Sequence, residues 1–145
     1  MHIRQQIRQA IADALTPLFA AGAVHVSRSA RIAPGGTPTV VITVPGETAQ
    51  RGAVLGQFRL QRVITVDISV TLAAAGADDA LDAAGEIIEA ALGGATTLGG
   101  LLDSELELTA TAIDFDDTAA TPAGELRMRY LAPTTVLAAA PSTRA

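Results

Sequence analysis

The chain has 145 residues and a formal charge of −5, and 49% of its residues are apolar, nearly all of them aliphatic. It has no Cys, which excludes disulfides and thiolate metal sites, and no Lys, which excludes Schiff-base catalysis and a P-loop. The negative charge argues against a broad nucleic-acid-binding face. These limits predict one domain with a thin aliphatic core, of the kind that a sheet and one or two helices enclose.

Neither the N-terminus nor the interior of the chain predicts targeting to a membrane. The opening residues, MHIRQQIRQ, are amphipathic and lack the continuous apolar core of a signal peptide. No stretch approaches the roughly 18 uninterrupted apolar residues of a membrane span. We therefore expect a protein that is made and used in the cytoplasm and has no membrane partner.

The first segment predicts an amphipathic helix over residues 2–16, because apolar residues recur every three or four positions. Thr16 and Pro17 then predict a kink or a fresh short turn, and Gly22 predicts the stop. Residues 23–32 alternate between apolar and polar types, which predicts a short strand.

Two segments of different character follow. Residues 39–44 are a β-branched run, which predicts a strand covered on both faces. Residues 45–57 contain three Gly and one Pro and predict a long loop between strands. Loops of that length tend to be mobile or functional.

Residues 58–72 predict one long strand, because apolar and polar residues alternate and only Arg62 and Val63 break the pattern. At about 3.3 Å per residue this segment spans roughly 50 Å, whereas ordinary strands span about 17–20 Å. A domain of this size cannot cover such a strand from end to end. Either the strand bends at Arg62 and Val63, or one end leaves the body and is covered by another chain.

A second helix is predicted over residues 78–92, with Asp78 and Asp79 capping its start. Gly85 in its interior costs about 1 kcal/mol relative to Ala, which a close approach of helix to sheet would justify. Residues 93–100 are rich in Gly and predict a flexible link.

The C-terminal part predicts two more strands. Residues 105–116 begin with inward apolar residues on one parity and end on the other, which predicts a bulge near residues 110–112. Residues 116–124 predict a polar turn, and residues 125–131 predict a strand that ends at Pro133 or lies on a sheet edge. The residues expected to point inward from the first of these strands are Leu106, Leu108, Ile113 and Phe115.

The predicted order is therefore helix, three strands, helix, two strands. A turn joins the last two strands, which favours antiparallel pairing and an α+β fold: a mainly antiparallel sheet with two helices packed on one face. The domain is expected to span residues 1–135, and residues 136–145 are expected to form a flexible C-terminal tail.

No residue pattern predicts catalysis. Asp114, Asp116 and Asp117 suggest a Ca²⁺ or Mg²⁺ site, but they lack the spacing of an EF-hand, so a solvated turn is the favoured interpretation. His2 and His25 have no second metal ligand at helical spacing. No Ser lies in G-x-S-x-G, and no Gly-rich stretch has the G-x-G-x-x-G spacing. We therefore expect a protein that is not an enzyme and that needs no cofactor or metal.

Charged residues of the predicted strands and of the loop before the longest strand are the candidates for a subunit contact. Arg forms bidentate pairs with carboxylates, and this chain offers many carboxylates. The simpler interpretation is that these residues lie on a solvent-exposed face of the sheet. The candidates are Arg51, Arg59, Arg62, Asp67, Arg127 and Arg129.

The order of segments resembles the small tail terminator proteins of long-tailed bacteriophages, the lambda minor tail protein U group. The resemblance lies in pattern and segment order and covers almost the whole chain. In chain order the segments are IRQQIRQAIADAL, a V-x-V strand, TVVITVPGE, FRLQRVITVDISVTL, DDALDAAGEIIEAAL and GELRMRYL.

The resemblance implies a structural virion protein that forms a homohexameric ring at the head-proximal end of the tail tube. Such a ring stops polymerisation of the tube and contacts the tail tube protein and the head-tail connector or stopper protein. DNA passes through its lumen without specific binding. An end of the 58–72 strand, together with residues 45–57, is the expected site of the intersubunit or tube contact.

Three alternatives are open at this point. One is an enzyme, which would need a base and an electrophile close together and would lose activity on substitution of His25 or Asp114. The chain could be another neck or head-completion protein of a phage or gene transfer agent, because such proteins look alike at this level. It could instead be a small-molecule-binding α+β domain, which would have a pocket with a few converging polar groups.

Overall fold

The computed structural model describes residues 1–26, 34–54, 57–93, 97–116 and 121–144. In chain order its elements are α1 (Ile3–Leu15), a 3₁₀ turn (Thr16–Leu18), β1 (Val24–Val26), β2 (Thr39–Val54), β3 (Gln57–Ala73), α2 (Ala77–Leu92), β4 (Glu107–Asp116), β5 (Ala123–Leu137) and β6 (Ala140–Arg144).

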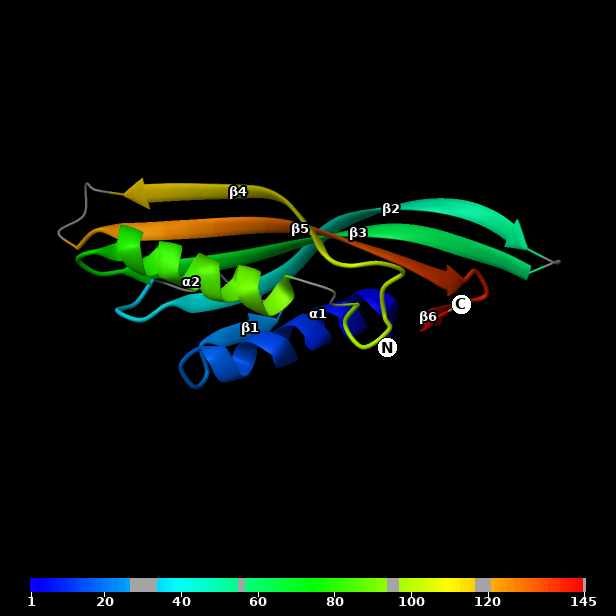
Figure 1. Ribbon diagram of the computed structural model, residues 1–145, viewed down its shortest axis with the longest axis horizontal. Coiled ribbons are helices and arrows are strands. Elements are labelled where there is room, and N and C mark those ends of the chain that lie inside the picture. Colours follow the sequence, from blue (N-terminus) through cyan, green and yellow to red (C-terminus); the bar gives the residue numbers. More distant parts are fainter. Residues whose placement is uncertain (27–33, 55–56, 94–96, 117–120, 145) are drawn as a thin grey trace.

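The strands form one sheet in the order β1-β2-β3-β5-β4, with β6 paired to β5. β1 and β2 run parallel, and the other described pairs are antiparallel. Both helices pack on the same face of the sheet, and no described element covers the opposite face (Figure 1). The predicted α+β fold with two helices on one face is confirmed, whereas the parallel β1–β2 pair and the additional β6 differ from the prediction.

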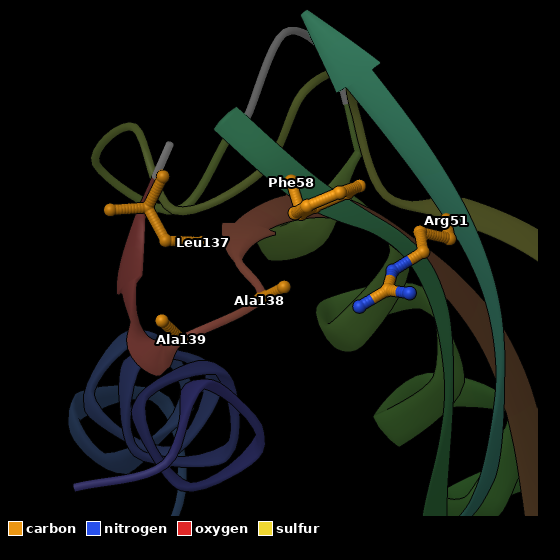
Figure 2. A pocket seen from close by; sticks show the side chains of 5 residues that line it. All are labelled: Arg51, Phe58, Leu137, Ala138 and Ala139. Carbon is orange, nitrogen blue, oxygen red and sulfur yellow. The ribbon is translucent and has the colours of Figure 1, made fainter. Parts of the chain in front are cut away.

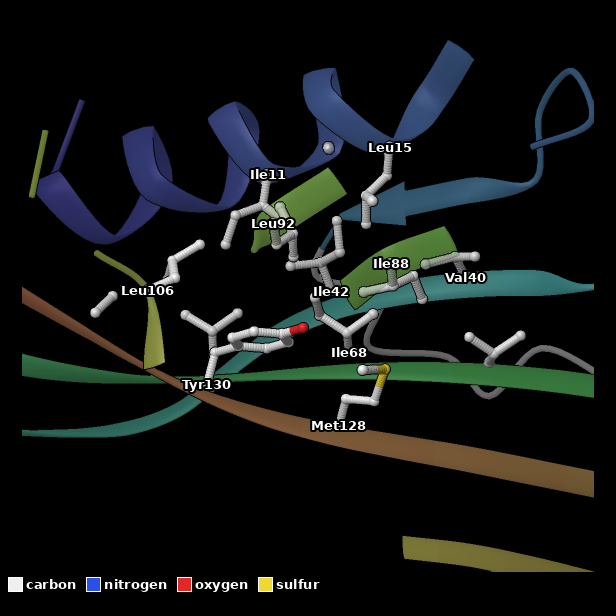
Figure 3. Packing of buried hydrophobic residues seen from close by; sticks show 14 of the residues in the cluster. Ile11, Leu15, Val40, Ile42, Ile68, Ile88, Leu92, Leu106, Met128 and Tyr130 are labelled. Atoms are coloured by element: carbon white, nitrogen blue, oxygen red, sulfur yellow. The ribbon is translucent and has the colours of Figure 1, made fainter. Parts of the chain in front are cut away.

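Alternate residues of β3 form the centre of the core. Ile64, Ile68 and Val70 are fully buried on the helix side, because successive side chains of a strand point to opposite faces. On the same face of the neighbouring β5, Met128 and Tyr130 are also buried. Figure 3 shows Ile68, Met128 and Tyr130 of the sheet against the apolar stripes of both helices. These stripes include Ile11 and Leu15 of α1 and Ile88 and Leu92 of α2.

The start and the middle of α2 differ in how well they were predicted. Gly76, with a left-handed φ of 73°, occupies the cap position, and no side-chain hydrogen bond caps the helix. The predicted capping by Asp78 and Asp79 is therefore wrong, although both carboxylates lie in the first turn, where the helix dipole favours them. The close approach predicted at Gly85 is confirmed, since a Cβ there would lie 3.0 Å from Leu126 Cδ2 of β5.

The largest difference from the predicted fold lies in residues 45–57, which were expected to form a loop. β2 instead continues to Val54 and pairs with β3 along this whole stretch. A bulge between Thr43 and Gly46 takes up Pro45, which cannot donate to the ladder. The side chains here are small or polar at nearly every position, so the apolar alternation by which a strand is recognised is missing.

β4 is an edge strand, and all ten of its positions are exposed. Its bulge lies between Leu108 and Ala110, slightly before the predicted place. Leu106 is buried as predicted, but Leu108, Ile113 and Phe115 are 38%, 44% and 42% exposed, so their predicted burial is wrong. They lie on the helix side of the sheet, but α2 packs over β3 and β5 and does not cover β4.

β5 does not end at Pro133 but continues to Leu137. The β4 ladder has ended before Pro133, and the backbone of Asp103 donates a hydrogen bond to the Pro133 carbonyl at 2.8 Å from that side. The missing N–H of Pro133 therefore costs no ladder bond. Within residues 136–144, part of the expected flexible tail, β6 pairs with β5 and Arg144 forms an ion pair with Asp103. The flexibility of the tail stays a prediction.

Some predictions fall partly outside the described residues. These are the part of the 23–32 strand that follows β1, residues 94–96 of the expected link and residues 117–120 of the expected polar turn. Within the described ranges, no helix is long and apolar enough to cross a membrane.

Candidate interaction surfaces

The end of the β2–β3 hairpin extends past both helices (Figure 1). Residues 46–54 of β2 and 57–65 of β3 are called the arm. Its root still packs on α1 and the core, and its β3 strand pairs with β5. Of the two predicted alternatives for the long strand, the structure shows the one in which an end leaves the body. β1 pairs with β2 only at Val40, Val41 and Ile42. Along the arm the outer edge of β2 therefore has no strand partner in the described chain, and its backbone groups are open to pairing.

Near the end of the arm, a cation and an aromatic ring form one exposed group, the tip patch, consisting of Arg51 and Phe58. The Arg51 guanidinium carbon lies 4.5 Å from the centre of the Phe58 ring. Phe58 is 54% exposed, which is unusual for so large an apolar side chain. Both residues line an open hollow of about 440 Å³, whose other lining residues are Leu137, Ala138 and Ala139 (Figure 2).

An ion-pair network fixes the root of the arm to α1. Glu47 Oε1 accepts hydrogen bonds from Arg62 Nη1 at 2.6 Å and from Arg4 Nη1 at 2.9 Å. The side chains of Arg62 and Glu47 are only 11% and 16% exposed. Arg62 therefore interrupts the apolar alternation of β3 because it lies on the helix side, where it reaches Glu47.

His2 caps α1 beside this network. Its Nδ1 accepts a hydrogen bond from the Arg4 backbone N–H at 3.2 Å, and its own backbone N–H donates to Gln5 Oε1 at 3.0 Å. Burial, and after it the positive charges of Arg4 and Arg62, lower the pKa of His2 below its ordinary value of 6.5. A cap of this kind works only while the ring is neutral, because a protonated Nδ1 cannot accept.

The lowered pKa of His2 predicts a loss of stability in mild acid. The unfolded chain binds the proton at higher pH than the folded one, so the stabilising effect is complete above about pH 6.5 and is lost as pH falls through the folded pKa. Thermal unfolding between about pH 8 and pH 5 should show a larger fall in midpoint for the natural chain than for His2→Asn, which caps without titrating. Parallel curves for the two proteins would contradict this.

The uncovered face of the sheet carries a bidentate ion pair. Asp67 of β3 lies opposite Arg129 of β5, and its two carboxylate oxygens accept from Arg129 Nε and Nη2 at 2.8 and 2.9 Å. This hydrogen bond raises the pKa of Arg129. Arg127 on the same face pairs with Glu125 at 2.9 Å, but through a single contact. The positive charge of each arginine is thus balanced by a carboxylate of the same chain.

The two pairs should differ in their effect on stability. The side chain of Asp67 is only 12% exposed, so Arg129→Met would leave a largely buried carboxylate without its partner. Glu125 is more open, with 30% of its side chain exposed, and Arg127→Met should leave it solvated. In denaturant titrations we expect Arg129→Met to lower the midpoint clearly and Arg127→Met to leave it nearly unchanged. Equal midpoints would show that the bidentate pair is not stabilising.

The six candidate interface residues do not form one cluster. Arg51 belongs to the tip patch and Arg62 to the root of the arm, on the helix side. Arg59 lies on the opposite side of β3, with its Nε buried and without a hydrogen-bond partner. The remaining three, Asp67, Arg127 and Arg129, form ion pairs within this chain on the uncovered face. A role of any of the six at an interface stays a prediction.

Sequence reasoning missed a second exposed surface, the ledge, which consists of Leu108, Ile113 and Phe115 on the helix side of β4. These residues were expected in the core because their alternation is that of a half-buried strand. The signal that they lie outside the core is indirect: α2 has a single apolar stripe, and its width covers only β3 and β5.

A row of carboxylates borders the ledge. Asp78, Asp82 and Glu89 lie at helical spacing on the side of α2 that also carries Gly85, and this acidic flank is exposed. Gly85 touches β5, and burial, followed by the charge of Glu89, raises the pKa of Tyr130 of β5 to about 12. The acidic flank therefore faces across β5 toward β4, where the ledge lies.

The described residues contain no group of three or more His, Cys, Asp or Glu side chains that could hold a metal ion. Asp114 and Asp116 lie in β4, and Asp117 falls outside the described ranges. His25 lies in β1 opposite Val41, with no ligand set around it in the described part of the chain.

Comparison with known proteins finds similarity among solved structures. No protein-family profile matches the chain, and no curated protein matches it. Its structure is similar to a chain in the solved structure described as "Virion of native gene transfer agent (GTA) particle", with a TM-score of 0.42 and 18% sequence identity. The similarity covers 91% of this chain and 92% of that one. At this TM-score and identity, no conclusion about function follows from it.

Proposed function

We propose that this chain is a structural protein of a phage-like particle: a tail terminator that forms a homohexameric ring at the head-proximal end of the tail tube. The order of segments in the sequence resembles that of tail terminators. The observation that carries the proposal is the arm, which leaves the body with an open strand edge and an exposed Phe58.

In a monomeric protein, an arm of this kind would favour aggregation through its open strand edge. Exposed strand edges pair readily with other chains, and proteins that stay monomeric usually shorten, charge or cover them. In a ring one surface of each subunit contacts a different surface of its neighbour, and the repeated rotation returns to the first subunit. An extended strand edge can therefore pair with the neighbouring subunit. The arm therefore supports assembly more directly than it supports any chemistry within one subunit.

The partners of such a ring would be the tail tube protein on one side and the head-tail connector or stopper protein on the other. The uncovered sheet face suits a lumen through which DNA passes without being held. Arg127 and Arg129 on that face are paired with carboxylates, which reduces the positive charge that phosphates would bind. The ring would be located in the neck of the virion, in a phage or in a gene transfer agent.

The test is to add the purified protein to the tail tube protein of the same particle while the tube polymerises. We expect native mass spectrometry to give the mass of six copies, and electron microscopy to show shorter tubes with a ring at one end. A protein that stays monomeric and leaves tube length unchanged would overturn the proposal. A ring that binds the connector but not the tube would identify another neck protein instead.

A further inference from the structure

The ledge is an apolar surface that the described chain leaves open. Leu126 and Tyr130, on the same face of the neighbouring β5, are buried under α2, while Ile113 and Leu108, their register partners on β4, are 44% and 38% exposed. Phe115 lies next to Leu81 at the start of α2, since both side chains approach Gly124. The ledge is thus an uncovered extension of the core, bounded on one side by the helix.

The charge around the ledge is of one sign. α2 has five carboxylates, and neither α2 nor β4 contains an Arg. Three of those carboxylates, Asp78, Asp82 and Glu89, form the acidic flank beside the ledge. The apolar ledge beside the acidic flank is complementary to a partner surface on which an apolar side chain and a cation lie close together.

The arm presents such a group. Beyond its root it carries Arg51 and Arg59 and no carboxylate. Arg51 stacks on Phe58, so the cation and the aromatic ring of the tip patch are held together before any contact is made. An aromatic ring with an adjacent Arg is the combination that most often dominates the energy of an interface.

The two surfaces cannot meet within one molecule. Figure 1 shows the arm at one end of the long axis, and the start of α2 and the end of β4 at the other. A contact between them therefore joins two copies head to tail, which is the heterologous arrangement that closes into a ring.

We propose that the ledge and its acidic flank bind the tip patch of a second copy of this chain. Phe58 packs on Ile113 and Phe115, and Arg51 pairs with carboxylates of the acidic flank. This inference rests on the proposed ring for its closure, but it names one contact that can be tested without the tube.

The test uses one variant of each surface. Arg51→Glu with Phe58→Ser alters the tip patch, and Asp82→Arg with Ile113→Ser alters the ledge; all four residues are exposed. In light scattering and native mass spectrometry, each variant alone should associate with itself at least about tenfold more weakly than the natural chain. Mixed one to one, they should form a complex of two chains and no ring, because only one intact tip and one intact ledge are present.

Matched controls separate this contact from a general effect of charge. Gln50→Glu adds a negative charge on the opposite face of the arm, and Asp13→Arg reverses an exposed charge on α1. Both should assemble as the natural chain does. Thermal unfolding of each variant shows whether it is folded.

A charge exchange keeps the inference falsifiable if either double variant is unstable. A chain that carries both Arg51→Glu and Asp82→Arg should regain the assembly that either single change weakens. If the variants of both surfaces form rings as the natural chain does, or if the mixture gives no complex, the inference is wrong. The proposed function survives that result as long as the natural protein forms rings that shorten tubes, and fails if it does not.

Discussion

A chain in which Asn-Gly joins Arg51 directly to Leu60 is expected to fold normally and to lose both ring formation and tube capping. The deletion removes Phe58, Arg59 and the turn of the arm, while Leu60, which packs against the core, is kept. Asn-Gly forms the two-residue turn that a hairpin of this register accepts. Because Phe58 is 54% exposed, the new turn closes the same pair of strands, and loop closure depends weakly on length, the free energy of unfolding should change by about 1 kcal/mol or less.

The loss of assembly should be large in comparison. Removing the central aromatic of an interface together with its surrounding contacts typically weakens binding by about a hundredfold or more. Denaturant titration measures the stability of the shortened chain, and native mass spectrometry and tube length measure its assembly. The control is an arm of full length with Thr48→Ala and Gln61→Ala, two exposed changes on its opposite face. A shortened chain that still forms rings would show that the arm is not needed for them.

The second large effect is expected at the root of the arm. Glu47→Ala removes the carboxylate that accepts from both Arg62 and Arg4 and leaves the guanidinium of Arg62, only 11% exposed, without its partner. Breaking a buried pair at one side costs about 3–5 kcal/mol, and we expect about 3 kcal/mol here because the side chains of Arg62 and Glu47 keep some exposure to solvent. At about 2–4 °C per kcal/mol for a chain near this size, the thermal midpoint should fall by roughly 10 °C.

Glu125→Ala is the matched control for that change, because Glu125 is also a strand residue paired with an Arg but in an exposed place. Its removal should leave the midpoint nearly unchanged. Glu47→Ala combined with Arg62→Met should recover part of the loss, because no uncompensated charge then remains buried. If Glu47→Ala and Glu125→Ala unfold at the same temperature, the network does not fix the arm.

The sequence predicted the arm in part. The length and alternation of residues 58–72 indicated a strand too long for its domain, and the structure confirms an end that leaves the body. Its partner strand was predicted as a loop, because residues 45–57 contain three Gly and one Pro and carry no apolar alternation. Gly and Pro usually mark turns, but here they lie in a β-bulge and in a strand with an exposed edge.

The candidate surfaces could be predicted less well than the elements that carry them. Apart from Arg51, which was expected in a loop, each candidate Arg could be placed on a strand and face from its position, but whether it has a partner depends on the neighbouring strand. Arg129 finds Asp67 because β3 and β5 are adjacent in register. The ledge was missed for the same reason. The pattern of β4 shows which side chains share a face, but whether that face is covered depends on where α2 packs on the sheet.

Local patterns in the chain were thus enough to predict both helices, the long strand, a bulged strand near residues 105–116 and the absence of Cys and Lys chemistry, because these depend on side-chain spacing and composition. The pairing of β2 with β3 in the arm, the parallel β1, the position of β6 and the exposure of the ledge appeared only in the folded chain. They depend on which segments far apart in sequence become neighbours. Strands pair through backbone hydrogen bonds, which every non-Pro residue can make, so the pattern of side chains does not reveal the pairing.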